Sequence, residues 1–188
     1  ETSTDNVLIN SDWSSLASGT VVSYDGKHYR LGTNAFTNIT DAVAATEVTN
    51  KITVLDGSYS GDQFFDGRTV EIGTADTAAE FSGYVFGGAH NNDSGDISMT
   101  FVNGSAGRVY GALFDQEGDY TVGDISINVG ENVTLTERAG AAKVYKGSLT
   151  TGDVVIDFSG TAVPLYGGAQ VWYKGSSAVH ESVTINFS

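Results

Sequence analysis

Four short segments repeat along the chain and decide its fold. They are Gly95-Asp-Ile-Ser-Met-Thr-Phe101, Gly123-Asp-Ile-Ser-Ile-Asn-Val129, Gly152-Asp-Val-Val-Ile-Asp-Phe158 and Glu181-Ser-Val-Thr-Ile-Asn-Phe187, and their starts lie 28, 29 and 29 residues apart. In each segment apolar and polar residues alternate with the period of a β-strand. Equivalent positions of a parallel solenoid stack directly on one another, so a single period with Ile, Val or Phe at fixed places predicts ladders of like side chains in one continuous core.

Two further series of similar residues lie between these segments. One is Val85-Phe-Gly-Gly-Ala89, Val109-Tyr-Gly-Ala112 and Leu165-Tyr-Gly-Gly-Ala169, and the other is Val144-Tyr-Lys-Gly-Ser148 and Trp172-Tyr-Lys-Gly-Ser176. Each repeat therefore holds two or three short strands joined by turns rich in Gly, Asn and Asp. We predict an all-β fold, a parallel β-helix (β-solenoid); an antiparallel sandwich or barrel is the alternative.

The N-terminal part of the chain does not follow the repeat. We interpret residues 1–50 as an N-terminal cap and residues 51–188 as solenoid coils, together forming one structural domain. Strands are expected at residues 7–9 and 52–55, and Asp25-Gly26 predicts the turn of a hairpin.

One short helix is predicted within the cap, at residues 37–46. Thr37 is the expected N-cap, and Ile39, Ala42 and Val43 fall on one side at helical spacing. A solenoid must shield the apolar end of its core, so this amphipathic helix is expected to cover that end.

These N-terminal residues also carry a resemblance to a known family. The run Asn34-Ala-Phe-Thr-Asn-Ile-Thr-Asp-Ala-Val-Ala44, followed by Ile52-Thr-Val-Leu-Asp-Gly-Ser-Tyr59, resembles the entry to right-handed parallel β-helix domains of the pectin-lyase-like type. The later Gly-Asp-Ile-Ser and Val-Tyr-Gly-Ala pieces resemble repeats of bacterial surface and autotransporter-passenger-like proteins. The resemblance covers residues 34–188 and implies an exported protein. It admits two functions, since such domains include polysaccharide lyases and hydrolases as well as adhesive or structural modules.

Composition excludes several classes of function. A net charge of −14 argues against nucleic-acid binding, which needs clustered Lys and Arg, and no apolar run is long enough to span a membrane. The absence of Cys excludes disulfides and thiolate metal sites. The chain starts without Met and ends in a strand, so we expect a piece of a longer protein whose open C-terminal coil self-associates or pairs with a further repeat.

The sequence shows no arrangement typical of a catalytic site. Pectin-lyase-like enzymes, by the resemblance, use Arg or Lys beside Ca²⁺ or clustered Asp residues, and such groups must converge on one groove. The best basic cluster is Arg138, Lys143, Lys146 and Lys174, which can bind an acidic glycan or can form an exposed face neutralised by neighbours such as Glu137. We predict no catalysis and no cofactor, with a polysaccharide lyase or glycoside hydrolase as the alternative.

His and Asp residues of this chain offer candidate metal ligands. The three His residues, His28, His90 and His180, share no metal-binding spacing and are interpreted as surface residues. Three carboxylates recur with the repeat, and stacked coils would bring them within roughly 5 Å of each other, where they repel. We expect them to splay into water, and a shared Ca²⁺ site is the weaker alternative; the residues are Asp96, Asp124 and Asp153.

Aromatic residues follow the apolar positions of the shorter series. If Val85, Val109 and Leu165 point into the core, the next residues point outward, which predicts one ladder of Phe86, Tyr110 and Tyr166 and a second of Tyr145 and Tyr173. Exposed ladders can stack sugars or anchor a protein partner, whereas packed ladders only stabilise the coil. The candidate ligand-binding residues are therefore Phe86, Tyr110, Tyr145, Lys146, Tyr166, Trp172, Tyr173 and Lys174.

The predicted function is a non-catalytic module of an extracellular or cell-surface protein, structural or adhesive, which binds a glycan or a host or cell-surface protein through such a face. Ice binding would need regular Thr rows, and only Thr100 and Thr184 fall in the outward row.

Overall fold

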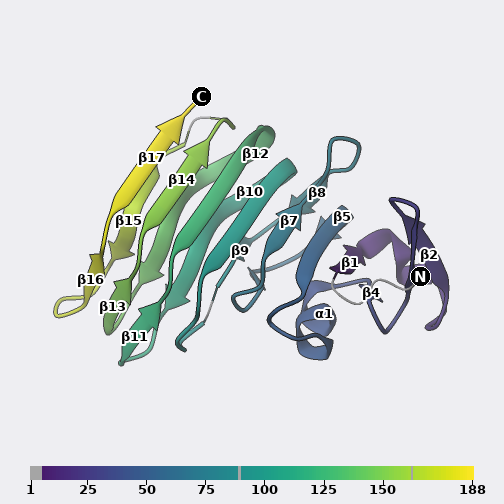
Figure 1. Cartoon of the computed structure of the whole chain (residues 1–188). Coiled ribbons are helices and arrows are strands. Elements are labelled where there is room, and N and C mark those ends of the chain that lie inside the picture. Colours follow the sequence, from purple (N-terminus) through teal and green to yellow (C-terminus); the bar gives the residue numbers. More distant parts are fainter. Residues whose placement is uncertain (1–5, 89, 162) are drawn as a thin grey trace.

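The computed structural model describes residues 6–88, 90–161 and 163–188 and shows a parallel β-solenoid of about six turns. Coil follows coil from the N-terminal to the C-terminal end of the molecule (Figure 1). All strand pairs of the two larger sheets are parallel, and among the described residues the antiparallel pairing is confined to one hairpin. The solenoid prediction is confirmed, and the antiparallel sandwich or barrel is wrong.

The strands fall into three sheets. The path of the main sheet, from the C-terminal edge inward, is β17 (Val183–Phe187), β14 (Val154–Phe158), β12 (Ile125–Val144), β10 (Ile97–Phe114), β7 (Val70–Ile72), β5 (Lys51–Tyr59), β1 (Asn6–Asn10) and β4 (Ala35–Phe36). Four more strands pair onto it, namely β6 (Gln63–Phe64), β8 (Ala79–Phe81), β9 (Tyr84–Phe86) and β15 (Leu165–Val171). The second sheet is β11 (Asp119–Val122), β13 (Ser148–Thr151) and β16 (Ser177–His180), and the third is the hairpin of β2 (Val21–Tyr24) and β3 (Lys27–Arg30).

The strand register matches the sequence period. Equivalent apolar residues of successive coils are direct partners, in the ladders Ile97–Ile125–Val154–Val183, Met99–Ile127–Ile156–Ile185 and Phe101–Val129–Phe158–Phe187. The last two ladders continue backwards through β7 and β5 to Val7 and Ile9 of β1. Stacking therefore begins inside the range interpreted as a cap. Each fully buried side chain of these ladders contributes about 1.5–3 kcal/mol by leaving water.

The helix α1 (Ile39–Ala45) packs its apolar side against the core at the N-terminal end. Its N-cap is Asn38, whose side-chain oxygen accepts from the backbone N–H of Asp41 at 2.8 Å. The prediction of Thr37 was wrong by one residue, because Asn38 is the residue that keeps extended backbone before the helix and has the better capping side chain. Ile39 and Ala42 are buried, and Val43 packs against the core, as predicted.

An arginine from the next coil fixes the end of this helix. Arg68 is buried, and its guanidinium donates to the carbonyl oxygens of Val43 and Thr46 at 2.7 and 2.5 Å. The last carbonyl groups of a helix lack hydrogen-bond donors within the helix, and the guanidinium of Arg68 provides those donors here. Burial lowers the pKa of Arg68.

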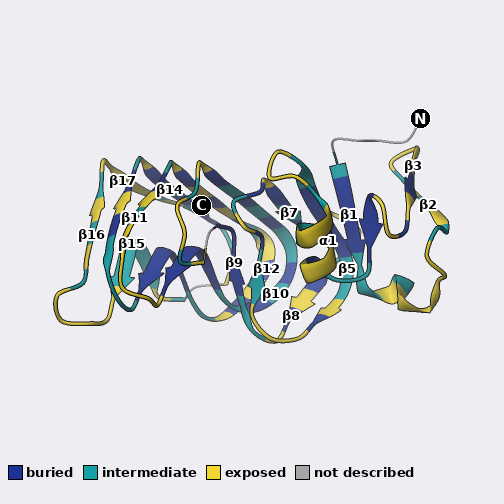
Figure 2. Ribbon diagram, turned by 90° about the horizontal axis from the view of Figure 1, so that it is seen from below, coloured by how far each residue is buried: buried dark blue, intermediate teal, exposed yellow. Residues whose placement is uncertain are grey.

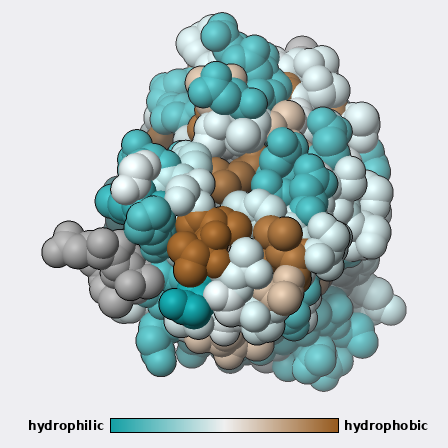
Figure 3. Space-filling view, turned by 90° about the vertical axis from the view of Figure 1, so that its right-hand side faces the viewer, coloured by the Kyte–Doolittle hydropathy of each residue, from teal (hydrophilic) through white to brown (hydrophobic). Residues whose placement is uncertain are grey.

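The remaining N-terminal elements cover one side of β1. The short helix η1 (Ser11–Ser15) and the hairpin flank a second apolar cluster, formed by Leu8, Tyr29, Leu31, Ala35 and Leu55. Apolar side chains remain visible in the middle of this end face (Figure 3), where a hollow of about 230 Å³ is lined in part by Leu16, Leu31 and Phe36.

The repeated Gly-Asp pairs form a hydrogen-bonded ladder at one corner. The Asp96 carboxylate accepts from the backbone N–H of Asp124 at 3.0 Å, and the Asp124 carboxylate accepts from that of Asp153 at 2.9 Å. Each carboxylate passes over the glycine of the next coil, where a Cβ would lie 2.2 Å from the Asp oxygen at both Gly123 and Gly152. Glycine is therefore required before Asp124 and Asp153, each of which stacks on the Asp of the preceding coil.

Gly95 and Gly123 allow a matched test of this corner. A Cβ on Gly95 meets nothing within 4 Å, because no Asp of this ladder lies below it, whereas one on Gly123 meets the Asp96 oxygen. We expect Gly123→Ala to lower the free energy of unfolding by about 1–3 kcal/mol and Gly95→Ala to change it by less than about 0.5 kcal/mol. Thermal or denaturant unfolding followed by circular dichroism checks this, and equal effects of the two substitutions would contradict the ladder.

Candidate ligand-binding face

The outer side of β9, β10, β12 and β15 carries a second packed layer. Val85 and Val109 point into the core, and the residues after them, Phe86 and Tyr110, point away from it as predicted. Both rings are nevertheless buried, with exposed fractions of 1% and 0%. They form a cluster with Leu113, flanked by Phe64, Tyr84 and Tyr145. The prediction that Phe86 and Tyr110 contact a ligand was therefore wrong, because neighbouring rings cover them.

The ring stack continues from coil to coil. Phe64 stacks on Phe86 with centroids 4.8 Å apart, and Phe86 stacks on Tyr110 at 5.9 Å. The next residue in register is Gly140, and a Cβ there would lie 3.1 Å from the Tyr110 ring and from Tyr166. The missing side chain at Gly140 therefore leaves room for both tyrosines.

The Tyr110 hydroxyl has a structural role. It donates to the side-chain oxygen of Gln170 at 2.9 Å, two coils further on. Burial raises the pKa of Tyr110 to about 12, so the hydroxyl keeps its proton and this hydrogen bond at physiological pH.

Cations gather over the exposed margin of this layer. Five of the nine Lys and Arg residues lie here or at the adjoining corner, and four of them sit over tyrosine rings. The distances to the ring centroids are 4.3 Å for Arg108 over Tyr84, 5.6 Å for Arg138 over Tyr166, 4.5 Å for Lys143 over Tyr145 and 5.7 Å for Lys146 over Tyr173. Such contacts stabilise by about 0.5–2 kcal/mol, more when water is excluded.

Most of these cations have no carboxylate partner. Arg108 forms an ion pair with Glu137, but Arg138, Lys143, Lys146 and Lys174 form none among the described residues. Lys143 is also buried, with an exposed fraction of 6%. In a chain of net charge −14, such unpaired cations make this face locally favourable for an anion.

Two exposed aromatic residues, Trp172 and Tyr173, lie at the corner after β12 and β15. Tyr145 stacks on Trp172 with centroids 6.0 Å apart, and Lys146 lies over Tyr173. The predicted stacking of Tyr145 on Tyr173 was wrong by one residue. The strand register pairs Val144 with Val171 and then Ser148 with Ser177, so the turn between these strands is longer in the last coil. Matching the similar residues of the two turns therefore placed Tyr145 one residue out of register.

A pocket of about 280 Å³ opens at this corner. It joins three of the predicted residues, Lys146, Tyr173 and Lys174, and is completed by Glu117, Gly147, Gly175 and Ser176. Trp172 and Tyr173 are 52% and 60% exposed. We call the set Tyr145, Lys146, Tyr166, Trp172, Tyr173 and Lys174, together with Arg138, the binding face; the buried Lys143 lies over the Tyr145 ring and is not part of it.

The structure places the predicted metal-site residues at the corner ladder. Asp96, Asp124 and Asp153 remain exposed, but one oxygen of each is held by the coil above, with Ser182 donating to Asp153 at 2.6 Å. We expected these three carboxylates to point away from one another into water, but each has one oxygen hydrogen-bonded to the next coil. No group of three or more His, Asp or Glu side chains suited to a metal ion occurs in the part of the chain that the structure describes.

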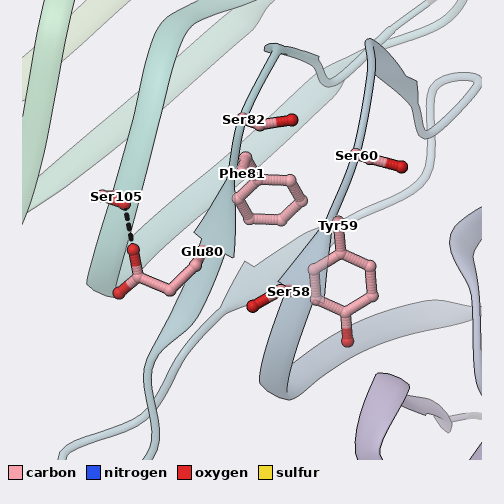
Figure 4. A pocket seen from close by; sticks show the side chains of 7 residues that line it. All are labelled: Ser58, Tyr59, Ser60, Glu80, Phe81, Ser82 and Ser105. Atoms are coloured by element: carbon pink, nitrogen blue, oxygen red, sulfur yellow. Dashed lines mark hydrogen bonds between the residues drawn. The ribbon is translucent and has the colours of Figure 1, made fainter.

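Sequence reasoning missed one surface groove, of about 370 Å³ (Figure 4). Its rim consists of hydroxyls and one carboxylate, Glu80, which accepts from Ser105. Its two rings, Tyr59 and Phe81, stack on each other 5.2 Å apart and are almost fully buried. The groove thus offers neither a cation nor an open aromatic surface; the other residues that line it are Ser58, Ser60 and Ser82.

A scan against protein-family models, a search of curated proteins and a search of solved structures each found no match to this chain. No helix among residues 6–88, 90–161 and 163–188 is long and apolar enough to cross a membrane.

The packed and exposed tyrosines of this surface should respond differently to loss of the hydroxyl. Tyr110→Phe leaves Gln170 without its donor inside the layer, so we expect a loss of about 1 kcal/mol in unfolding free energy. Tyr173→Phe is the control, because its ring is exposed and its hydroxyl donates no hydrogen bond to another residue in the described chain. Denaturant unfolding of both variants measures the difference, and a neutral Tyr110→Phe would show that the buried hydrogen bond contributes nothing.

Proposed function

We propose that this solenoid is a non-catalytic binding module of an exported cell-surface protein and that its binding face takes a glycan carrying acidic groups. The corner pocket is the observation that supports this most directly. There the exposed ring of Tyr173 lies beside Lys146 and Lys174, neither of which has a carboxylate partner among the described residues. The exposed ring of Trp172 precedes Tyr173 in the chain and stacks on Tyr145.

The chemistry of the pocket suits such a ligand. An aromatic ring offers a flat apolar surface on which the C–H face of a sugar can stack. A lysine ammonium donates charge-assisted hydrogen bonds to carboxylate or sulfate oxygens. Because the rest of the chain is strongly acidic, the local cations also orient an anionic chain toward this corner.

The composition of the pocket also favours binding over hydrolysis. Glu117 is the one carboxylate among the residues that line it. The usual routes of glycoside hydrolysis need two carboxyl groups facing each other across the bond.

The proposal predicts loss of binding from two substitutions at the corner. Lys146→Ala combined with Lys174→Ala should weaken binding of galacturonate, alginate or chondroitin sulfate oligomers by about tenfold or more, and Trp172→Ala by about tenfold. Calorimetry with the best ligand of that set measures this, and affinity should fall as salt is added.

Lys27→Ala is the matched control, because Lys27 is an exposed lysine on the N-terminal hairpin. Neutral dextran oligomers test the need for an acidic group. Unchanged binding by the double lysine variant, or no binding of any acidic oligomer by the parent protein, would overturn the proposal.

We also propose that this 188-residue chain associates with itself through its last coil. The inward ladders end at Val183 and Phe187, which are 45% and 72% exposed because no coil covers them, and β17 forms the end of the main sheet. The last coil is visibly less buried than the coils beneath it (Figure 2). An open strand edge with apolar side chains favours pairing with another chain.

Charged residues at the inward positions of β17 should block this association. We expect the parent chain to form larger species as its concentration rises, and Val183→Lys combined with Phe187→Lys to shift it toward monomer. Val21→Lys, at a half-exposed position of the N-terminal hairpin, serves as the control. Sedimentation velocity measures the distribution, and a strictly monomeric parent at high concentration would contradict the proposal.

A further inference from the structure

A histidine connects the strands of the last coil. His180 ends β16 and is the register partner of Thr151, which is in turn the partner of Val122; both of those residues are buried. The His180 side chain reaches across the coil to β15, where its Nε2 accepts from the backbone N–H of Ala169 at 3.0 Å. The prediction that His180 is a surface residue holds in part, because the residue is half-buried and both ring nitrogens are hydrogen-bonded.

The contacts of His180 define its protonation state. Nε2 accepts a hydrogen bond, so it carries no proton, and the ring proton of the neutral imidazole lies on Nδ1. Nδ1 is 2.7 Å from the Thr151 hydroxyl oxygen, and that hydroxyl donates to the carbonyl oxygen of Gly152 at 2.9 Å. One neutral tautomer thus satisfies every donor and acceptor and joins β13, β15 and β16.

A second proton cannot be accommodated in this arrangement. It would sit on Nε2 and point at the N–H of Ala169, so two donors would face each other. Space on that side is limited, since a Cβ on Gly168 would lie 3.1 Å from Nε2. Burial lowers the pKa of His180.

The surrounding elements supply no charge that would stabilise an imidazolium. Strands β13 and β17 contain no ionisable side chain, and β15 contains only Tyr166, which packs beside Arg138. Glu181 follows His180 in the chain, and the nearby Asp153 carboxylate already accepts from Ser182. Among the described residues no carboxylate contacts the ring, and its two nitrogens bond to Thr151 and Ala169.

The strand held by His180 carries part of the binding face. Tyr166 lies on β15, and the chain runs from its end directly into Trp172, Tyr173 and Lys174. We propose that His180 is a pH-sensitive latch that holds β15 in place, so that acid loosens the last coil and weakens ligand binding at the corner pocket. The binding half of this inference rests on the proposed function, whereas the latch itself does not.

The direction of the pH effect follows from the neutral ring. The ordinary pKa of His is 6.5, and the folded value lies below it. The latch is therefore fully closed above about pH 6.5 and is lost as the pH falls through the folded pKa. Between the two pKa values, each pH unit raises the equilibrium constant for opening by up to about tenfold.

Hydrogen exchange of the Ala169 amide tests the latch without any ligand. After correction for the intrinsic exchange rate, protection should fall between about pH 7.5 and about pH 5 in the parent chain. His180→Gln places a non-titrating oxygen near the Nε2 position and should abolish most of this pH dependence. His28→Gln, on the exposed hairpin, should retain it in full.

Two outcomes would overturn the latch. One is an acid-induced loss of protection in His180→Gln equal to that of the parent. The other uses the parent chain, so it applies even if that variant fails to fold. NMR titration of the ring would overturn the latch by showing a His180 pKa at or above 6.5, or a proton on Nε2 at neutral pH.

Binding of the best acidic oligomer, measured over the same pH range, separates the latch from the proposed function. A fall in affinity that tracks the loss of Ala169 protection supports the coupling, and pH-independent affinity with a loosened strand overturns it. If no oligomer binds at any pH, the proposed function fails, while the exchange data still decide whether His180 holds β15.

Discussion

Parallel register between successive coils is the constraint on which every other feature of this molecule depends. Adjacent coils are one strand spacing apart, about 4.8 Å, so each residue contacts its equivalents above and below more closely than most of its sequence neighbours. The core ladders, the aromatic stack and the corner hydrogen bonds are all consequences of this alignment. A slip of one residue would turn each apolar ladder toward water, so the register must be specified strongly.

Polar side chains at the corners supply part of that specification. The side-chain oxygens of Asp62, Asp93, Asp96 and Asp124 each accept from a backbone N–H of the following coil, 22 to 29 residues further on. Such groups satisfy backbone donors where the strands bend. Part of the acidity of the chain is therefore structural. Because these corners are acidic, the unpaired Lys and Arg residues of the binding face form a distinct electrostatic region.

The fold could be predicted from the sequence because the decisive pattern is local and repeated. Period-2 alternation shows that Phe86 and Tyr110 point away from the core, but it cannot show that Phe64, Tyr84 and Tyr145 cover them, since that depends on contacts between four successive coils. Turn length caused the error at Tyr145. The similar residues Tyr145 and Tyr173 lie 28 residues apart, whereas the strands align Val144 with Val171, 27 residues apart. The sequence gives little indication of the role of His180. The residue occupies the position equivalent to Thr151 and Val122 of the preceding coils. One polar residue at that position does not reveal whether its side chain turns inward.

The binding face lies where the solenoid changes from a rigid to a more open structure. Its inner side rests on the buried stack of Phe86 and Tyr110, which is held by neighbouring coils on both sides. Its outer side, with Trp172 and Tyr173, belongs to the last coil, which is covered from one side alone in this chain. Local stability falls with the number of buried contacts, so the exposed half of the face depends on the few groups that tie β15 and β16 to the body. A hydrogen bond at this end has fewer neighbouring contacts to share its role than the same bond in the middle of the stack, and the proposed effect of His180 on the corner residues rests on this difference.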